Sequence, residues 1–235
     1  APMAEDELCW MPAADLAAAI AKKKVSPVEV VEAVLARIER LERLNAYVTL
    51  DAESARKAAR AAERAVMKKG ARLGPLHGVP FSVKDLVITK GVRTTFGTPL
   101  YKDHVPDEDA PMVERLKAAG AIMIGKTNTP SFGWIGATHN LLFGITRNPW
   151  NLERTPGGSS GGASAAGAAG LAPLAIGTDG GGSIRIPAAH TGLVGLKPSY
   201  GRIAQHPADS PFADVISQGV LSRTVHDTAL ALNVM

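Results

Sequence analysis

The chain has 235 residues, enough for one domain or at most two, and its 46% hydrophobic and 20% charged residues are typical of a soluble globular protein rather than a disordered or fibrous one. The longest weakly charged stretch, residues 157–178, is broken by Gly, Ser and Pro, so no membrane span is predicted. A net charge of +4 spread along the chain, with only 5% aromatic residues, argues against direct nucleic-acid binding. The single cysteine, Cys9, cannot form an internal disulfide, which favours a cytoplasmic location.

Two helices are predicted in the amino-terminal part. Residues 26–41 start with Ser26 as N-cap, Pro27 at the first helical position and Glu29 completing a capping box. Residues 51–70 form an Ala-rich surface helix that Gly70 ends.

The elements that follow alternate between helix and strand. Residues 78–88 are predicted as a strand or strand end that carries Lys84, and they precede a helix at 110–120 and a strand at 121–125. A helix at about 162–170 and a strand at about 171–177 come next. The alternation predicts an α/β fold whose sheet is at least partly parallel.

Charge is unevenly distributed along the chain. Residues 1–154 hold 40 of the 48 charged side chains, and residues 155–235 hold the other eight. Because charged side chains avoid burial unless they are paired, the second stretch is expected to form the centre of the fold and to contain the functional residues. At its end, the segment from Ser222 opens as a helix with Thr224 or Ser222 as N-cap, and the chain stops at Met235 within that helix.

Two short motifs match known patterns without the required context. Residues Gly120–Thr127 match the phosphate-loop pattern, but their middle residues form an apolar strand and no helix follows, so nucleotide binding is kept only as a weak alternative. Residues 157–161 match the G-x-S-x-G elbow of hydrolases, yet a turn-rich loop precedes them instead of a strand. The six histidines lack metal-ligand spacing, so no metal is predicted, although a Ser-His-Asp triad assembled in space stays open.

The segment 177–185, GTDGGGSIR, carries a clearer signal. Three glycines before Ser183 allow a tight turn whose N–H groups converge beside the hydroxyl, as an oxyanion hole requires. A glycine-rich turn packed against a neighbouring strand is the alternative.

Three separated segments together resemble the amidase signature family. They are GVPFSVKD around Lys84, PGGSSGGASAA at 156–166 and GTDGGGSIRIPAAHTGLVGLKPSYGRI at 177–203, with NPWN at 148–151 adding to the match. The resemblance implies an α/β/α fold with a mixed central sheet flanked by helices, incomplete without a C-terminal half. It therefore implies one amidase domain over 1–235, truncated at its C-terminal end, with a helical region at 1–70 and the signature core at 71–235.

The resemblance also implies a Ser-Ser-Lys triad. Ser183 would be the nucleophile, Ser159 the bridging serine after a cis peptide bond, and Lys84 the base, although Lys84 and Asp85 taken alone could be an ordinary surface pair. The oxyanion hole would use the backbone N–H groups of Gly180, Gly181, Gly182 and Ser183. The residues expected to support this site are Ser160, Thr178, Asp179 and Arg185.

The implied activity is hydrolysis of a small-molecule amide to an acid plus ammonia or amine, through an acyl-enzyme on Ser183 and without metal or organic cofactor. Family members that act as the A-type subunit of a glutamyl-tRNA amidotransferase commonly have Thr and Gln where this chain has Gly180 and Ile186. A free-standing amidase is therefore favoured, that subunit is the alternative, and a homodimer is left open.

Overall fold

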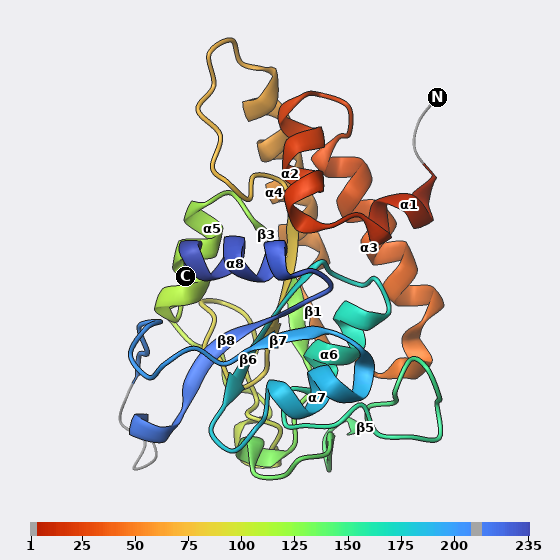
Figure 1. Ribbon diagram of the computed structural model, residues 1–235, viewed down its shortest axis with the longest axis vertical. Helices are drawn as coiled ribbons and strands as arrows, with labels where there is room; N and C mark the ends of the chain where they lie inside the picture. Colours follow the sequence, from red (N-terminus) through yellow and green to blue (C-terminus); the bar gives the residue numbers. More distant parts are fainter. Residues whose placement is uncertain (1–3, 208–212) are drawn as a thin grey trace.

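A six-stranded sheet lies at the centre of the protein, in the order β1-β3-β2-β6-β8-β7. The computed structural model describes residues 4–207 and 213–235 (Figure 1). Strand β2 pairs in parallel with β3 and β6, whereas β1 runs antiparallel to β3, and β8 runs antiparallel to both β6 and β7. The strands of this sheet are β1 (Tyr47–Leu50), β2 (Pro80–Lys84), β3 (Ile122–Thr127), β6 (Leu174–Asp179), β7 (Val194–Leu196) and β8 (Ser217–Ser222).

Helices flank this mixed sheet, so the predicted fold class is confirmed (Figure 1). The helices are α1 (Glu5–Trp10), α2 (Ala13–Ala21), α3 (Pro27–Arg40), α4 (Ala52–Met67), α5 (Pro111–Ala118), α6 (Gly161–Ala168), α7 (Arg185–Thr191) and α8 (Val225–Val234). A separate antiparallel pair joins β4 (His139–Asn140) to β5 (Gly144–Ile145). Within the described ranges, no helix has the length and apolar character needed to cross a membrane.

The predicted capping box of α3 is confirmed. The Ser26 hydroxyl accepts a hydrogen bond from the Val28 N–H at 3.0 Å, and the Ser26 N–H donates to the Glu29 carboxylate at 3.0 Å. Helix α4 ends at Met67, three residues before Gly70, and strand β6 begins at Leu174 rather than at about 171. The strand begins later than predicted because Gly170, with a φ of 71°, turns the chain after α6.

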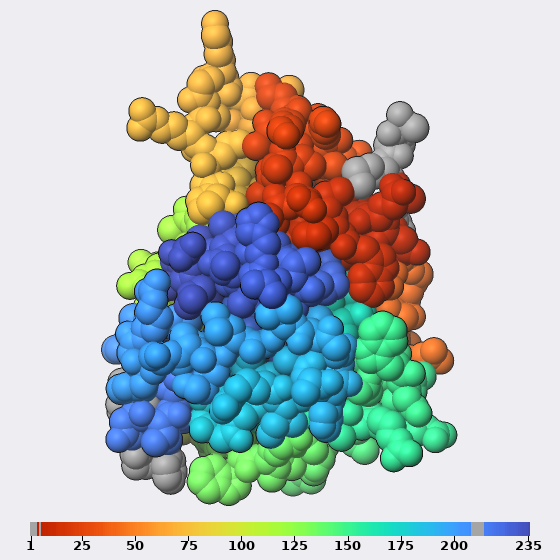
Figure 2. Space-filling model, in the orientation of Figure 1, coloured from red at the N-terminus to blue at the C-terminus, as the bar shows by residue number. Residues whose placement is uncertain are grey.

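The start of α8, near one end of the described chain, contacts the start of α2, near the other. Thr224 is the N-cap of α8, because its hydroxyl accepts from the Asp227 N–H at 3.0 Å. The buried Asp227 carboxylate accepts in turn from the N–H groups of Ala13 and Ala14, at 3.0 and 2.9 Å, at the start of α2. In Figure 2, α8 (dark blue) accordingly lies against the amino-terminal helices (red).

The prediction that the charge-poor part forms the centre of the fold holds for residues 156–179 and for β8, which are buried almost throughout. It is wrong for residues 180–202, many of which are exposed. The reason is their place in the sheet: β7 is an edge strand, and α7 precedes it.

Candidate active site

Lys84 is the last residue of β2, and its side chain is fully buried. The Lys84 Nζ donates hydrogen bonds to Ser159 Oγ at 2.6 Å, to Ser160 Oγ at 2.9 Å and to Thr178 Oγ1 at 3.0 Å. Ser159 and Ser160 immediately precede α6, and Thr178 lies near the end of β6. The structure therefore brings together residues from three separate segments around one nitrogen, and the alternative of a surface Lys84–Asp85 pair is wrong because both side chains are buried.

The surroundings of Lys84 favour its neutral form. Burial lowers the pKa of Lys84 to about 7, although the Asp179 carboxylate acts in the opposite direction. The three hydrogen-bond partners of the amine are hydroxyl groups, which can also donate a proton to a neutral nitrogen. An amine in this state can act as a general base near neutral pH.

The serine pair lies in a tightly packed turn. The peptide bond between Gly158 and Ser159 is cis, as the family resemblance predicts. The Ser160 hydroxyl donates to the Thr178 carbonyl at 3.2 Å, and the Ser160 N–H donates to the Ser183 carbonyl at 3.1 Å. The turn that holds the two serines is thus bonded directly to the residue predicted as nucleophile.

Asp179 organises the loop that carries Ser183. Its buried carboxylate accepts from the backbone N–H groups of Gly182 at 2.7 Å and Ile184 at 3.1 Å, and from the Arg185 guanidinium through two bonds of 2.9 Å. Burial opposes ionisation of Asp179, but the Arg185 side chain and the N–H donors outweigh it and lower the pKa to about 2. The loop is therefore folded around a carboxylate whose ionised form its hydrogen-bond donors favour.

The same contact affects the predicted oxyanion hole. Because the Gly182 N–H donates to Asp179, it is already engaged in this arrangement, with a φ of 116° at Gly182. Gly180 and Gly181 are exposed and Ser183 is half-buried. The assignment of the oxyanion hole stays a prediction, and the engaged N–H of Gly182 is not available to it in this arrangement.

The phosphate-loop match is not a nucleotide site. The strand predicted at 121–125 is confirmed, but it runs two residues further: Ile122–Thr127 form the buried strand β3. The Lys126 side chain is fully buried, and its Nζ donates to the Val87 carbonyl and to the hydroxyls of Thr89 at 3.1 Å and Thr94 at 2.7 Å. A lysine held in this way cannot contact phosphates.

Three of the six histidines form hydrogen bonds away from the Lys84 cluster. The His77 and His104 rings hydrogen-bond to the carbonyls of Ala62 and Thr94 at 3.0 Å, and His206 pairs with Glu108 at 3.2 Å. None of the described residues form a group of three or more His, Cys, Asp or Glu side chains that could hold a metal ion.

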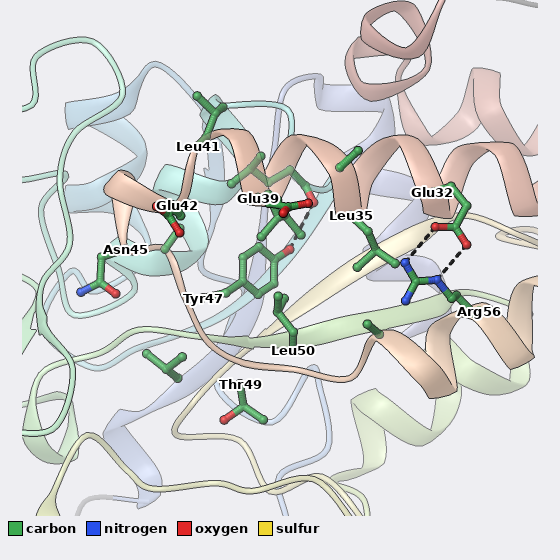
Figure 3. A pocket seen from close by; sticks show the side chains of 16 residues that line it. Glu32, Leu35, Glu39, Leu41, Glu42, Asn45, Tyr47, Thr49, Leu50 and Arg56 are labelled. Carbon is green, nitrogen blue, oxygen red and sulfur yellow. Dashed lines mark hydrogen bonds and ion pairs between the residues drawn. The ribbon is translucent and has the colours of Figure 1, made fainter.

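A cavity of about 730 Å³ between α3, β1 and α4 lies apart from this cluster (Figure 3). Its wall contains the ion pair of Glu32 with Arg56, at 2.8 Å, and Tyr47, whose hydroxyl donates to the Leu171 carbonyl at 3.2 Å. None of the predicted site residues lines it.

Comparisons with known proteins agree with the motif analysis. The family model described as Amidase matches residues 29–235. An acylamidase of Rhodococcus erythropolis is 46% identical over 234 residues, which are 99% of this chain and 49% of that protein. The A-type subunit of the glutamyl-tRNA(Gln) amidotransferase of Roseiflexus sp. (strain RS-1) is 50% identical over 191 residues, 81% of this chain and 39% of that protein.

A solved structure shows the same fold. A bacterial aryl acylamidase of the amidase signature family has a TM-score of 0.89 at 40% identity, covering 96% of this chain and 47% of that protein. The chain thus spans half or less of the length of each of these relatives.

Proposed function

The chain belongs to the amidase family, and we propose on this premise that it carries the catalytic residues of an enzyme that hydrolyses carboxylic amides to an acid plus ammonia or amine. The observation that carries the proposal is the environment of Lys84: a fully buried amine whose hydrogen-bond partners are the hydroxyls of Ser159, Ser160 and Thr178.

In the proposed reaction, Ser183 Oγ attacks the amide carbon while its proton passes through the Ser159 hydroxyl to the neutral Lys84 Nζ. Backbone N–H groups of Gly180, Gly181 and Ser183 stabilise the negative charge that develops on the carbonyl oxygen. The proton then returns through Ser159 to the amide nitrogen, the C–N bond breaks and the amine leaves. Water hydrolyses the resulting ester on Ser183 by the same proton path.

The remaining predicted residues have positioning roles in this proposal. Ser160 and Thr178 hold the Lys84 amine towards Ser159. Asp179 and Arg185 hold the loop that presents Ser183. We further propose that residues 1–235 belong to one amidase domain, that the substrate is a small molecule, and that the protein is cytoplasmic, given its single cysteine.

The A-type subunit of a glutamyl-tRNA amidotransferase is the second candidate, supported by the 50% identity to the Roseiflexus protein. Gly180 and Ile186, which stand where such subunits commonly have Thr and Gln, favour the free-standing amidase.

A screen of simple aliphatic and aryl amides tests the proposal. Release of ammonia or amine by the protein alone supports the amidase, whereas activity that needs added partner proteins supports the second candidate. Ser183→Ala should abolish turnover and labelling by a fluorophosphonate, and Ser159→Ala and Lys84→Ala should each lose at least ~10²-fold in kcat/KM.

Ser82→Ala is the matched control. Ser82 lies on β2 two residues before Lys84, and its buried hydroxyl is not among the hydrogen-bond partners of the Lys84 amine. This variant should retain activity. Wild-type turnover by Ser183→Ala would refute the assignment of the nucleophile.

A further inference from the structure

The turn that carries Ser159 and Ser160 is closed by a residue outside it, Thr138. Thr138 directly precedes β4 and is only 1% exposed. Its hydroxyl donates to the Gly157 carbonyl at 2.9 Å and accepts from the Gly161 N–H at 3.1 Å. One side chain therefore joins the residue two positions before Ser159 to the residue two positions after it.

The two residues at the centre of the turn lack such bonds. Neither Gly158 nor Ser159 forms a backbone hydrogen bond within the part of the chain that the structure describes. The turn packs closely on the residue before Thr138, because a Cβ at Gly158 would lie 2.6 to 2.7 Å from three backbone atoms of Ala137. The position of Ser159 thus depends on the Thr138 hydroxyl at both flanks and on packing against Ala137.

The proposed reaction requires Ser159 to be placed accurately. Its Oγ lies 2.6 Å from Lys84 Nζ and must also take the proton of Ser183. A methyl group in place of the Thr138 hydroxyl would pack at about 3.5 Å from the carbonyl and the N–H, so the turn would open by about half an ångström. Since a misplacement of about 1 Å can lower a rate by about 10²-fold, such an opening should slow the reaction measurably.

Thr146 offers a comparison at the other end of the same hairpin, directly after β5. Its hydroxyl is also buried, donates to the Asn45 carbonyl at 2.7 Å and accepts from the Asn128 side-chain amide at 2.9 Å. Its N–H donates to the Thr138 carbonyl at 3.0 Å. The two threonine hydroxyls thus have the same kinds of partner, but only the bonds of Thr138 end on the serine turn.

We propose that Thr138 is a positioning residue for the amide hydrolysis: its hydroxyl closes the serine turn and so holds the Ser159 hydroxyl in place between Lys84 and Ser183. Thr138 acts through the turn and not on the substrate. The inference rests on the proposed function, in which Ser159 relays the proton.

Thr138→Val tests this role, because it keeps the branched shape of the side chain and removes both hydrogen bonds. We expect kcat for a small amide to fall roughly 10- to 100-fold while KM stays within about twofold, since the relay acts on the chemical step. Thr138→Ser restores the hydroxyl and should keep kcat within about threefold of the parent.

Thr146→Val is the matched control. It also leaves two hydrogen-bond partners of a buried hydroxyl unsatisfied, so it should lower the melting temperature about as much as Thr138→Val does. Its kcat should stay within about threefold of the parent, because the serine turn is intact. An equal loss of kcat in the two variants would overturn the proposal and leave the amidase standing.

A double variant shows whether Thr138 acts through Ser159. In the Ser159→Ala background, Thr138→Val should cause little further loss of kcat/KM, because the relay is already absent. A further loss as large as that in the parent would show that Thr138 affects activity by another route, and the proposal would be wrong.

The rate of fluorophosphonate labelling at Ser183 separates this proposal from the proposed function. Labelling should be slowed in Thr138→Val and unchanged in Thr146→Val. If the parent were labelled but hydrolysed no amide, the proposed function would be refuted, whereas slower labelling of Thr138→Val would still support the role of Thr138 and equal labelling would overturn it. If Thr138→Val does not fold, Thr138→Ala, which cannot overpack the site, takes its place.

Discussion

Lys84 and Lys126 lie on adjacent parallel strands, are both fully buried, and occupy neighbouring register positions: Lys84 is opposite Thr127, and Lys126 is opposite Val83. Because side chains alternate along a strand, the two lysines point to opposite faces of the sheet. The Lys84 amine contacts hydroxyls of the candidate active site, whereas the Lys126 amine holds the loop after β2 through Val87, Thr89 and Thr94. Two buried lysines on adjacent strands thus have entirely separate hydrogen-bond partners.

The first prediction concerns the pH dependence of activity. Since burial lowers the pKa of Lys84 to about 7 and its neutral form is the proposed base, kcat/KM should rise with pH through about 7. A pH profile of amide hydrolysis measures this limb, and the residual activity of Lys84→Ala should lack it.

Lys126 provides the control, because burial lowers its pKa to about 7 as well. The double variant with Lys126→Met and Asp85→Asn removes the two buried ionisable groups that face each other away from the Lys84 amine. It should keep the rise of kcat/KM with pH. If the double variant lost the rise of kcat/KM with pH while Lys84→Ala kept it, the rise would be due to Lys126 or Asp85. The assignment of Lys84 as the base would then be wrong.

The second prediction concerns stability. Between about pH 7 and the ordinary lysine pKa, unfolded Lys84 binds a proton that the folded state does not bind, so the free energy of unfolding increases with pH in this window. The parent should therefore gain about 1.4 kcal/mol per pH unit relative to Lys84→Met. Urea titrations of both proteins from pH 7 to 10 measure the difference between their free energies of unfolding, in which the contributions of unchanged groups cancel. A difference that stays constant over this range would contradict the lowered pKa of Lys84.

The third prediction separates the two members of the Asp179–Arg185 pair. Asp179 is fully buried and accepts backbone N–H groups, whereas the Arg185 side chain is 55% exposed. Asp179→Ala should therefore lower kcat by more than Arg185→Ala, because it leaves the N–H groups of Gly182 and Ile184 without their acceptor. Steady-state kinetics of both variants test this order, and equal losses would show that the loop depends on the ion pair alone.

The fourth prediction concerns the packing of α6. A Cβ at Gly162 would lie 2.3 Å from the backbone nitrogen of Asn128 and 2.7 Å from the Ala46 carbonyl oxygen, so neither neighbour can yield without moving a strand or its flank. Gly162→Ala should lower the melting temperature. Gly136→Ala, whose Cβ would meet only the Ile186 side chain at 3.8 Å, is the matched control and should change it little.

Local signals in the sequence predicted the helices at 26–41 and 51–70 and the strand that carries Lys84, because capping residues and apolar runs act over a few positions. The short strands β1, β7 and β8 were not predicted, since three to six residues between turns carry little periodic signal.

For the candidate site, too, local patterns predicted individual residues but not the contacts between distant segments. The motifs named Lys84, Ser159 and Ser183, and the structure brings Lys84 and Ser159 together. The pairing of Thr178 with Gln218 was not predicted, because it depends on the return of β8 between β6 and β7, which no local pattern encodes. The strand predicted at 121–125 stopped one residue before Lys126, and the partners that allow the burial of Lys126 come from the loop after β2.

The contact of Asp227 with the start of α2 has a consequence for synthesis of the protein on the ribosome. The N–H groups of Ala13 and Ala14 find their acceptor 214 and 213 residues later in the chain. At about 5 to 20 residues per second, that carboxylate leaves the ribosome roughly 10 to 40 s after the helix it caps. During this interval the N–H groups of Ala13 and Ala14, although synthesised first, lack this acceptor, so α2 can complete the contact only after α8 has been made.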